Sequence, residues 1–297
     1  MPNLEKNLKI PEPAFTLYDE FAHGRIDRRK FMAGLGKLAV GALTVNLLVE
    51  ALMPNYAKAE QVSFNDPDIT ASFREFPSPQ GHGTGRGYLV TPKDNQQKMP
   101  VILVVHENRG INPYIKDVAR RFAKQGFIAF APDGLFPLGG YPGNDEKGKE
   151  LQRSMDKGKL LQDFFAAANF LKKLENSNSK LGVIGFCYGG GVVNKIATEL
   201  PDVINAGVPF YGSAPDLEQV SLIKAPLMIQ MGELDKRIAK QWGGYEAALK
   251  QHHKDYQGFI YQGARHGFHN DSTARFDEAN ALLAWQRTLA FFKLHLS

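Results

Sequence analysis

The chain has 297 residues, of which 43% are hydrophobic, 23% charged and 11% aromatic, and its formal net charge is +5. This composition excludes an intrinsically disordered chain, which would combine low hydrophobicity with high net charge. The single cysteine excludes a disulfide framework and a cysteine-rich metal site. No run of 18 apolar residues occurs and the basic residues form no block, so we expect neither a stable membrane span nor nucleic-acid binding.

The first 59 residues resemble an export signal. A basic segment at 28–31 (RRKF) precedes an almost uncharged run at 38–49 and the sequence AKA at 57–59. These are the three parts of a cleaved signal, and the paired arginines resemble a twin-arginine signal, although Asp27 departs from that pattern. We therefore expect a leader over 1–59 that directs the protein to the periplasm. The alternative is a retained amphipathic helix that packs on the protein's own body or on a partner, in which case the protein stays in the cytoplasm.

Residues 60–297 alternate apolar runs with helical patterns and are expected to form one α/β domain. The continuous run at 101–106 (VILVVH) indicates a strand buried on both faces. Strands alternating with helices predict a mostly parallel sheet with helices on both faces, and chemistry at the carboxyl ends of the strands. The expected strands are 87–91, 101–106, 127–131, 181–186, 207–211, 227–231 and 259–261; the expected helices are 114–124, 160–174, 190–200, 242–253 and 277–296; and 134–148 is expected to be a long loop.

The strongest functional signal is the segment 185–191 (GFCYGGG), between a predicted strand and a predicted helix. It has the form of a nucleophile elbow, Gly-x-Nuc-x-Gly, with Cys187 as the nucleophile. So sharp a turn leaves no room for side chains two residues away, and Gly185 and Gly189 have none. The amino end of the following helix favours the thiolate, which is the reactive form of cysteine.

A thiol nucleophile needs a base, and the base needs a residue that orients it. In hydrolases with this turn the chain order is nucleophile, acid, histidine. Asp235 and His266 follow the last two predicted strands in that order, with His269 as the rival base. His106 and Asp133 also end strands, and we expect them to be a hydrogen-bonded structural histidine and an Asx turn.

Two backbone N–H groups are expected to form an oxyanion hole. One belongs to Tyr188, directly after the nucleophile, and the other to Asn108, in the loop after an earlier strand. The sequence contains no local metal-ligand pattern such as His-Glu-x-x-His and no phosphate-binding loop, so no metal and no cofactor is predicted.

These motifs make residues 85–296 resemble the dienelactone hydrolase family, the carboxymethylenebutenolidases. The resemblance implies the α/β-hydrolase fold of that family. The resemblance implies a triad of Cys187, His266 and Asp235. It also implies that Glu107 meets the resting thiol and is displaced when substrate binds, which helps to form the thiolate. The matching segments are VVHENRG (104–110), APDG (131–134), GFCYGGG (185–191), PFYG (209–212), GELD (232–235) and GARHGF (263–268).

The chain departs from this family where the best-known members hold a substrate carboxylate with two arginines. The corresponding stretches, 134–138 and the position of Asn270, supply no arginine. A neutral lactone or ester is therefore expected to react at least as well as a carboxylated one. Arg109, Phe136 and Tyr141 are the predicted substrate-binding residues, and Arg265 and Arg275 are further candidates for the missing cation.

We expect a hydrolase that cleaves a small-molecule lactone or ester through an acyl-enzyme on Cys187. The alternative is a non-catalytic scaffold of the same fold, attached through the N-terminal segment. A redox-sensing thiol is disfavoured because no second cysteine could resolve a sulfenic acid. The oligomeric state is left open.

Overall fold

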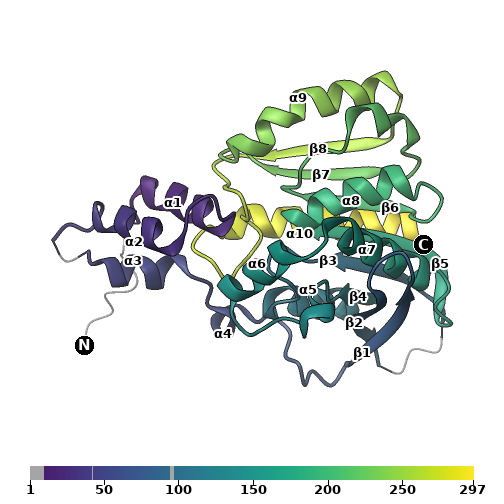
Figure 1. The fold of residues 1–297 in the computed structure, drawn as a ribbon. Coiled ribbons are helices and arrows are strands. Elements are labelled where there is room, and N and C mark those ends of the chain that lie inside the picture. Colours follow the sequence, from purple (N-terminus) through teal and green to yellow (C-terminus); the bar gives the residue numbers. More distant parts are fainter. Residues whose placement is uncertain (1–9, 42, 94–96) are drawn as a thin grey trace.

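The computed structural model describes residues 10–41, 43–93 and 97–297. Its centre is an eight-stranded sheet, counted over these residues, in the order β1-β2-β4-β3-β5-β6-β7-β8 (Figure 1). Strands β3 to β8 run parallel, whereas the hairpin of β1 and β2 pairs antiparallel with β4. The strands are β1 (Ile69–Ser78), β2 (Gly83–Pro92), β3 (Met99–Val105), β4 (Ile128–Pro132), β5 (Ser177–Phe186), β6 (Ala206–Phe210), β7 (Leu227–Gly232) and β8 (Tyr256–Tyr261).

Helices cover both faces of the sheet, so its side chains enter two separate cores. Along β3, Ile102 and Val104 join one core and Leu103 and Val105 the other, because successive strand residues point to opposite faces. The first core also receives α5 (Pro113–Lys124) and α10 (Glu278–Leu296). The second receives α7 (Lys157–Lys172), α8 (Tyr188–Glu199) and α9 (Lys236–Gln251). The remaining elements of this region are α6 (Asp145–Ser154) and the 3₁₀ turns η2 (Phe136–Leu138) and η3 (Leu217–Leu222).

The N-terminal region forms a small helical cluster with its own apolar centre. It contains α1 (Glu12–Ala22), α2 (Arg28–Gly36) and α3 (Val45–Leu52), which gather on the side of the molecule opposite the C-terminus (Figure 1). Tyr18, Phe31 and Leu48 are buried together there. The short helix α4 (Tyr56–Ala59) follows these helices and contacts α5. Among the described residues, none of the helices combines the length and hydropathy that a membrane crossing requires.

The structure confirms the predicted sheet with helices on both faces, and it corrects several boundaries. The predicted loop over 134–148 is wrong at its end, because α6 begins at Asp145 with the Asn144 side chain as its cap. Helix α9 begins six residues earlier than expected, because the Asp235 side chain accepts from the Ile238 N–H and caps it. The strand expected over 87–91 is part of the longer β2, and β1 precedes it as a further ten-residue strand. Residues 1–9 and 42 of the predicted leader lie outside the described residues, and the division at residue 59 stays a prediction.

Candidate active site

Cys187 occupies the sharp turn between β5 and α8. Its backbone has φ 56° and ψ −111°, a conformation that residues other than glycine rarely adopt. A Cβ added to Gly185 would lie 2.2 Å from the Gly189 carbonyl oxygen, and one added to Gly189 would lie 2.3 Å from the Val105 carbonyl oxygen. The two glycines are therefore required by close backbone approach, as the elbow motif predicts.

Replacing Gly189 by Ala tests this requirement against a matched glycine. Gly189 and Gly243 both lie within helices, but a Cβ at Gly243 would meet no atom within 4 Å. Gly189→Ala should lower the free energy of unfolding by about 1–3 kcal/mol through overpacking. Gly243→Ala should raise it by about 0.5–1 kcal/mol through helix propensity. Urea unfolding of both variants measures the difference, and equal effects would contradict the close approach at the elbow.

The structure brings Cys187, His266 and Asp235 together at the carboxyl ends of β5, β7 and β8. The His266 Nδ1–H donates to the Asp235 carboxylate over 2.5 Å. The His266 Nε2 and the Cys187 Sγ lie within 4.8 Å of each other. All three side chains are buried, so their charges interact through little water.

These charges shift the pKa values of the pair in opposite directions. Burial alone would raise the pKa of the Cys187 thiol, but the neighbouring His266 imidazolium outweighs burial and lowers it below its usual range. Burial alone would lower the pKa of His266, but the Cys187 thiolate and the Asp235 carboxylate raise it to about 9. Each of the two groups therefore favours the charged form of the other.

His269 lies in a different environment from His266. Its Nδ1 is 2.7 Å from the Tyr114 hydroxyl, and its ring packs between Phe186 and Phe210. Burial and the nearby Arg121 cation lower the pKa of His269 to about 3. These contacts hold His269 in the aromatic core as a neutral structural residue.

His106 and Asp133 have the structural contacts expected of them. The His106 Nδ1–H donates to the Glu107 carbonyl, and its Nε2 accepts from the Gly134 N–H. The Asp133 carboxylate accepts from the Leu135 N–H, which is an Asx turn.

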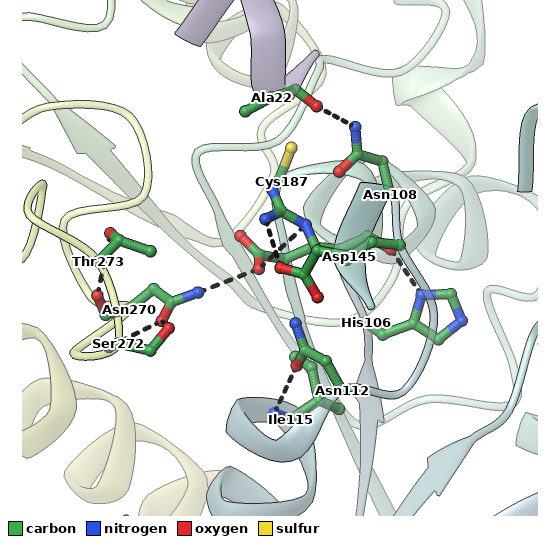
Figure 2. Close-up of polar contacts among 12 residues, drawn as sticks. Ala22, His106, Asn108, Asn112, Ile115, Asp145, Cys187, Asn270, Ser272 and Thr273 are labelled. Carbon is green, nitrogen blue, oxygen red and sulfur yellow. Dashed lines mark hydrogen bonds and ion pairs between the residues drawn. The ribbon is translucent and has the colours of Figure 1, made fainter. Parts of the chain in front are cut away.

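Glu107 is a buried carboxylate between an amide and a guanidinium. Its Oε2 accepts from the Asn270 Nδ2–H over 3.1 Å and lies 3.9 Å from the Arg109 Nε. Arg109 itself donates to Asp145 over 3.0 Å. Asn270, which stands where the best-known family members have an arginine, therefore holds Glu107, and Figure 2 shows Asn270 and Asn108 on opposite sides of Asp145.

A cavity of about 370 Å³ opens beside Cys187. Phe136 and Tyr141, predicted as substrate-binding residues, are not brought to it: Arg86 stacks on the Phe136 ring and the Tyr141 hydroxyl donates to Asp145. The predicted oxyanion residues Tyr188 and Asn108 do line it, and Arg109 does not. The lining residues are His23, Asn108, Lys157, Leu161, Cys187, Tyr188, Gly191, Val192, Lys195, Ser213, Ala214 and Arg237.

The N-terminal helices contribute to this site, which no motif in the sequence predicts. The His23 Nε2, just after α1, lies 3.7 Å from the Cys187 Sγ and 3.3 Å from the His266 Nε2. The Asn108 side-chain N–H donates to the Ala22 carbonyl, and both lie close to Cys187 in Figure 2. No local pattern marks His23, because its partners lie 164 and 243 residues away along the chain.

Arg275, one of the candidates for the missing cation, also holds helix α1 against the catalytic domain. It is 3% exposed and donates to the Asp19 carboxylate of α1 over 2.6 Å. Its guanidinium also stacks on the Tyr18 ring. Arg275 is thus occupied by α1 in this structure. Arg265 likewise pairs with Glu12 of α1.

A mostly parallel sheet with helices on both faces and a strained nucleophile turn after β5 define the class of this protein, an α/β hydrolase. The chain belongs to the dienelactone hydrolase family, whose model matches residues 86–296. A second family model, described as YqhI-like, matches residues 1–40. The chain is therefore a hydrolase of the dienelactone hydrolase family that carries an additional N-terminal segment.

Individual relatives agree with this assignment. The "Putative hydrolase fragment YghX" of Escherichia coli strain K12 is 60% identical over 114 residues, which are 38% of this chain and 97% of that protein. A "Probable 2-oxo-3-(5-oxofuran-2-ylidene)propanoate lactonase" of Bradyrhizobium sp. is 33% identical over 67% of this chain and 85% of its own. The crystal structure of a "Putative Dienelactone Hydrolase" from Klebsiella pneumoniae subsp. pneumoniae MGH 78578 superposes with a TM-score of 0.65 at 25% identity, covering 75% of this chain and 99% of that one.

Proposed function

We propose that the protein hydrolyses a lactone or ester through Cys187, His266 and Asp235. The observation that carries this proposal is the arrangement of a buried thiol, imidazole and carboxylate at three neighbouring strand ends, with the His266 ring oriented by Asp235. A non-catalytic scaffold of the same fold has no need of this arrangement.

The reaction follows from the positions of these groups. The Cys187 thiolate attacks the acyl carbon, and the oxyanion that forms accepts from the backbone N–H groups of Tyr188 and Asn108. The His266 imidazolium then gives its proton to the leaving oxygen, and the C–O bond breaks to leave a thioester. Next, neutral His266 takes a proton from water, whose oxygen attacks the thioester carbon. Collapse of this intermediate releases the acid and restores the thiolate and imidazolium.

Glu107 opposes the thiolate in the resting site. Its negative charge raises the pKa of Cys187, against the effect of His266. A substrate that moves the Glu107 carboxylate further from Cys187 would therefore strengthen the nucleophile at the moment of binding. The guanidinium of Arg109, 3.9 Å from Glu107, is placed to receive the carboxylate.

The charge of the cavity supports an anionic substrate, in contrast to the neutral one expected from the missing arginines. Lys157, Lys195 and Arg237 line it, and no carboxylate stands among the described residues that do so. The Bradyrhizobium relative is named for a furanone that carries a propanoate. We propose that the substrate of this protein is a lactone or ester with a carboxylate, bound by these three cations.

Arg237→Gln tests the charge of the substrate. Hydrogen bonds to charged groups contribute about 1.5–3 kcal/mol, so KM for a carboxylated ester should rise about tenfold or more, while KM for its neutral analogue should change little. Lys240→Gln is the control, because it removes the same charge from an exposed position on the same helix. Equal losses with the charged and the neutral ester would contradict an anionic substrate.

Export of the protein stays a prediction, and the length of the mature chain tests it. Cleavage after Ala59 would produce a periplasmic protein that begins at Glu60 and lacks His23. Intact-mass measurement on the periplasmic fraction of the native cell should then match residues 60–297. A cytoplasmic protein whose mass includes residues 10–59 would instead support the packed-helix alternative, and the site would keep its contacts with α1.

A further inference from the structure

Three electron-pair donors converge where the N-terminal segment meets the triad. The His23 Nδ1–H donates to the Asp19 carbonyl over 2.7 Å, and the His266 Nδ1–H donates to the Asp235 carboxylate. A neutral imidazole carries only one N–H group. When the His266 imidazolium gives up its Nε2 proton, both Nε2 atoms therefore present lone pairs, and they face each other at 3.3 Å with the Cys187 Sγ beside them.

A single proton does not satisfy this arrangement. A proton on the His266 Nε2 can point at the Cys187 Sγ or at the His23 Nε2, but it leaves the other without a donor. A metal ion at the centre of the three atoms accepts an electron pair from each of them at once. The thiolate and the Asp235 carboxylate would balance the two positive charges of a divalent ion.

The two separations measured from the His23 Nε2 match a tetrahedral metal site. Zinc binds imidazole nitrogen at about 2.0–2.1 Å and thiolate sulfur at about 2.3 Å. At tetrahedral angles these bond lengths place two nitrogens about 3.3 Å apart and a nitrogen and a sulfur about 3.6 Å apart. The Nε2 atoms of His23 and His266 are 3.3 Å apart, the Sγ is 3.7 Å from the His23 Nε2, and all three lie within 4.8 Å of one another.

The two imidazoles make the second hydrogen bond that is typical of metal-binding histidines. Such histidines donate their other N–H to a carboxylate or to a backbone carbonyl, which fixes the ring orientation. Asp235 does this for His266, and the Asp19 carbonyl does it for His23. The Asp19 residue is itself held by the ion pair between its carboxylate and Arg275.

We propose that His23, Cys187 and His266 form a binding site for a borderline-soft divalent cation such as Zn²⁺, with the fourth position open to the cavity beside Cys187. Imidazole and thiolate ligands favour such ions over Mg²⁺ or Ca²⁺. The bound ion joins the N-terminal segment to the catalytic domain. It also engages the sulfur and the base of the proposed triad, so the metal-loaded protein lacks a free thiolate nucleophile.

Cobalt(II) binding to the full-length protein tests the site. The protein is first treated with a chelator and freed of it, and Co²⁺ alone is then added stepwise while the absorption spectrum is recorded. One equivalent per chain should produce a sulfur-to-cobalt charge-transfer band in the near ultraviolet and visible bands of four-coordinate cobalt. One equivalent of Zn²⁺ should remove both, and Zn²⁺ should also protect Cys187 from iodoacetamide.

Variants at His23 separate metal binding from simple packing. His23→Phe fills the same space without a lone pair and should weaken Co²⁺ binding at least about 100-fold. His23→Cys supplies another ligand and should retain tight binding. His253→Ala, which changes an exposed histidine, is the control and should leave binding unchanged. Thermal unfolding in the presence of chelator verifies that each variant is folded.

Two results would overturn the site: a wild-type cobalt spectrum without the sulfur charge-transfer band, or equal cobalt affinity in the wild type and His23→Phe. The spectrum reports ligation by Cys187 whether or not the protein cleaves an ester. A failed metal site thus leaves the proposed hydrolysis standing, and a failed hydrolysis leaves the metal site standing.

Discussion

Replacing Cys187 by Ala should reduce kcat for a lactone or aryl ester by at least about 10⁴-fold, because it removes the side chain that forms the proposed acyl-enzyme. Cys187 is the only cysteine of the chain. Iodoacetamide should therefore add one label to the wild type, with loss of activity, and none to Cys187→Ala. Kinetics and intact-mass measurement, both carried out in chelator, check these outcomes.

Cys187→Ser provides the matched control for this result. It keeps the shape of the side chain in the strained turn, so its thermal unfolding should resemble that of the wild type. Its hydroxyl is far less acidic than the thiol, so the His266 base should activate it poorly and activity should stay well below the wild type. Full activity in Cys187→Ala would contradict the proposed nucleophile.

Removal of the base should have the second largest effect. His266→Ala should lower kcat/KM by about 10²–10⁴-fold, the usual contribution of a general base. His269→Ala should act mainly on stability, because His269 packs in the aromatic core and bonds to Tyr114. Steady-state kinetics corrected for the folded fraction, together with thermal unfolding, distinguish the two effects.

Recovery of activity by added imidazole distinguishes His266→Ala from His269→Ala. Imidazole can enter the space left by His266→Ala, next to the open cavity, and should restore part of the activity. It should have no such effect on His269→Ala. If His269→Ala is the more damaging change after correction for folding, the base lies three residues further along the loop than we propose.

Much of this site could be predicted because its signals are local. The glycines that flank Cys187 are required within one turn, and their spacing is visible in the sequence. Asp235 and His266 each follow a strand directly, and parallel strands bring their carboxyl ends to one edge of the sheet. A motif and a strand pattern were therefore sufficient to place the three residues together.

The surroundings of the site depend on packing between distant segments, and no local pattern reports such packing. His23 reaches Cys187 only because α1 docks through the Asp19–Arg275 ion pair and the Ala22–Asn108 hydrogen bond. The absence of a metal site was predicted from ligand spacing within single segments, whereas the three proposed ligands lie on three separate ones.

The charge of the cavity also depends on the tertiary structure. The two positions where the best-known family members carry arginines both lack one, and Arg109, Arg265 and Arg275 were the candidates that the sequence offered instead. Lys157, Lys195 and Arg237 come from α7, α8 and α9, and only the packing of these helices on one face of the sheet places their cations around the same cavity. The sequence thus determined the fold class and indicated the residues of the proposed triad, since both depend on short-range patterns. The docking of α1 beside Cys187 and the position of the three cations around the cavity depend on contacts between residues far apart in the chain. Many such pairings are compatible with the same sequence pattern.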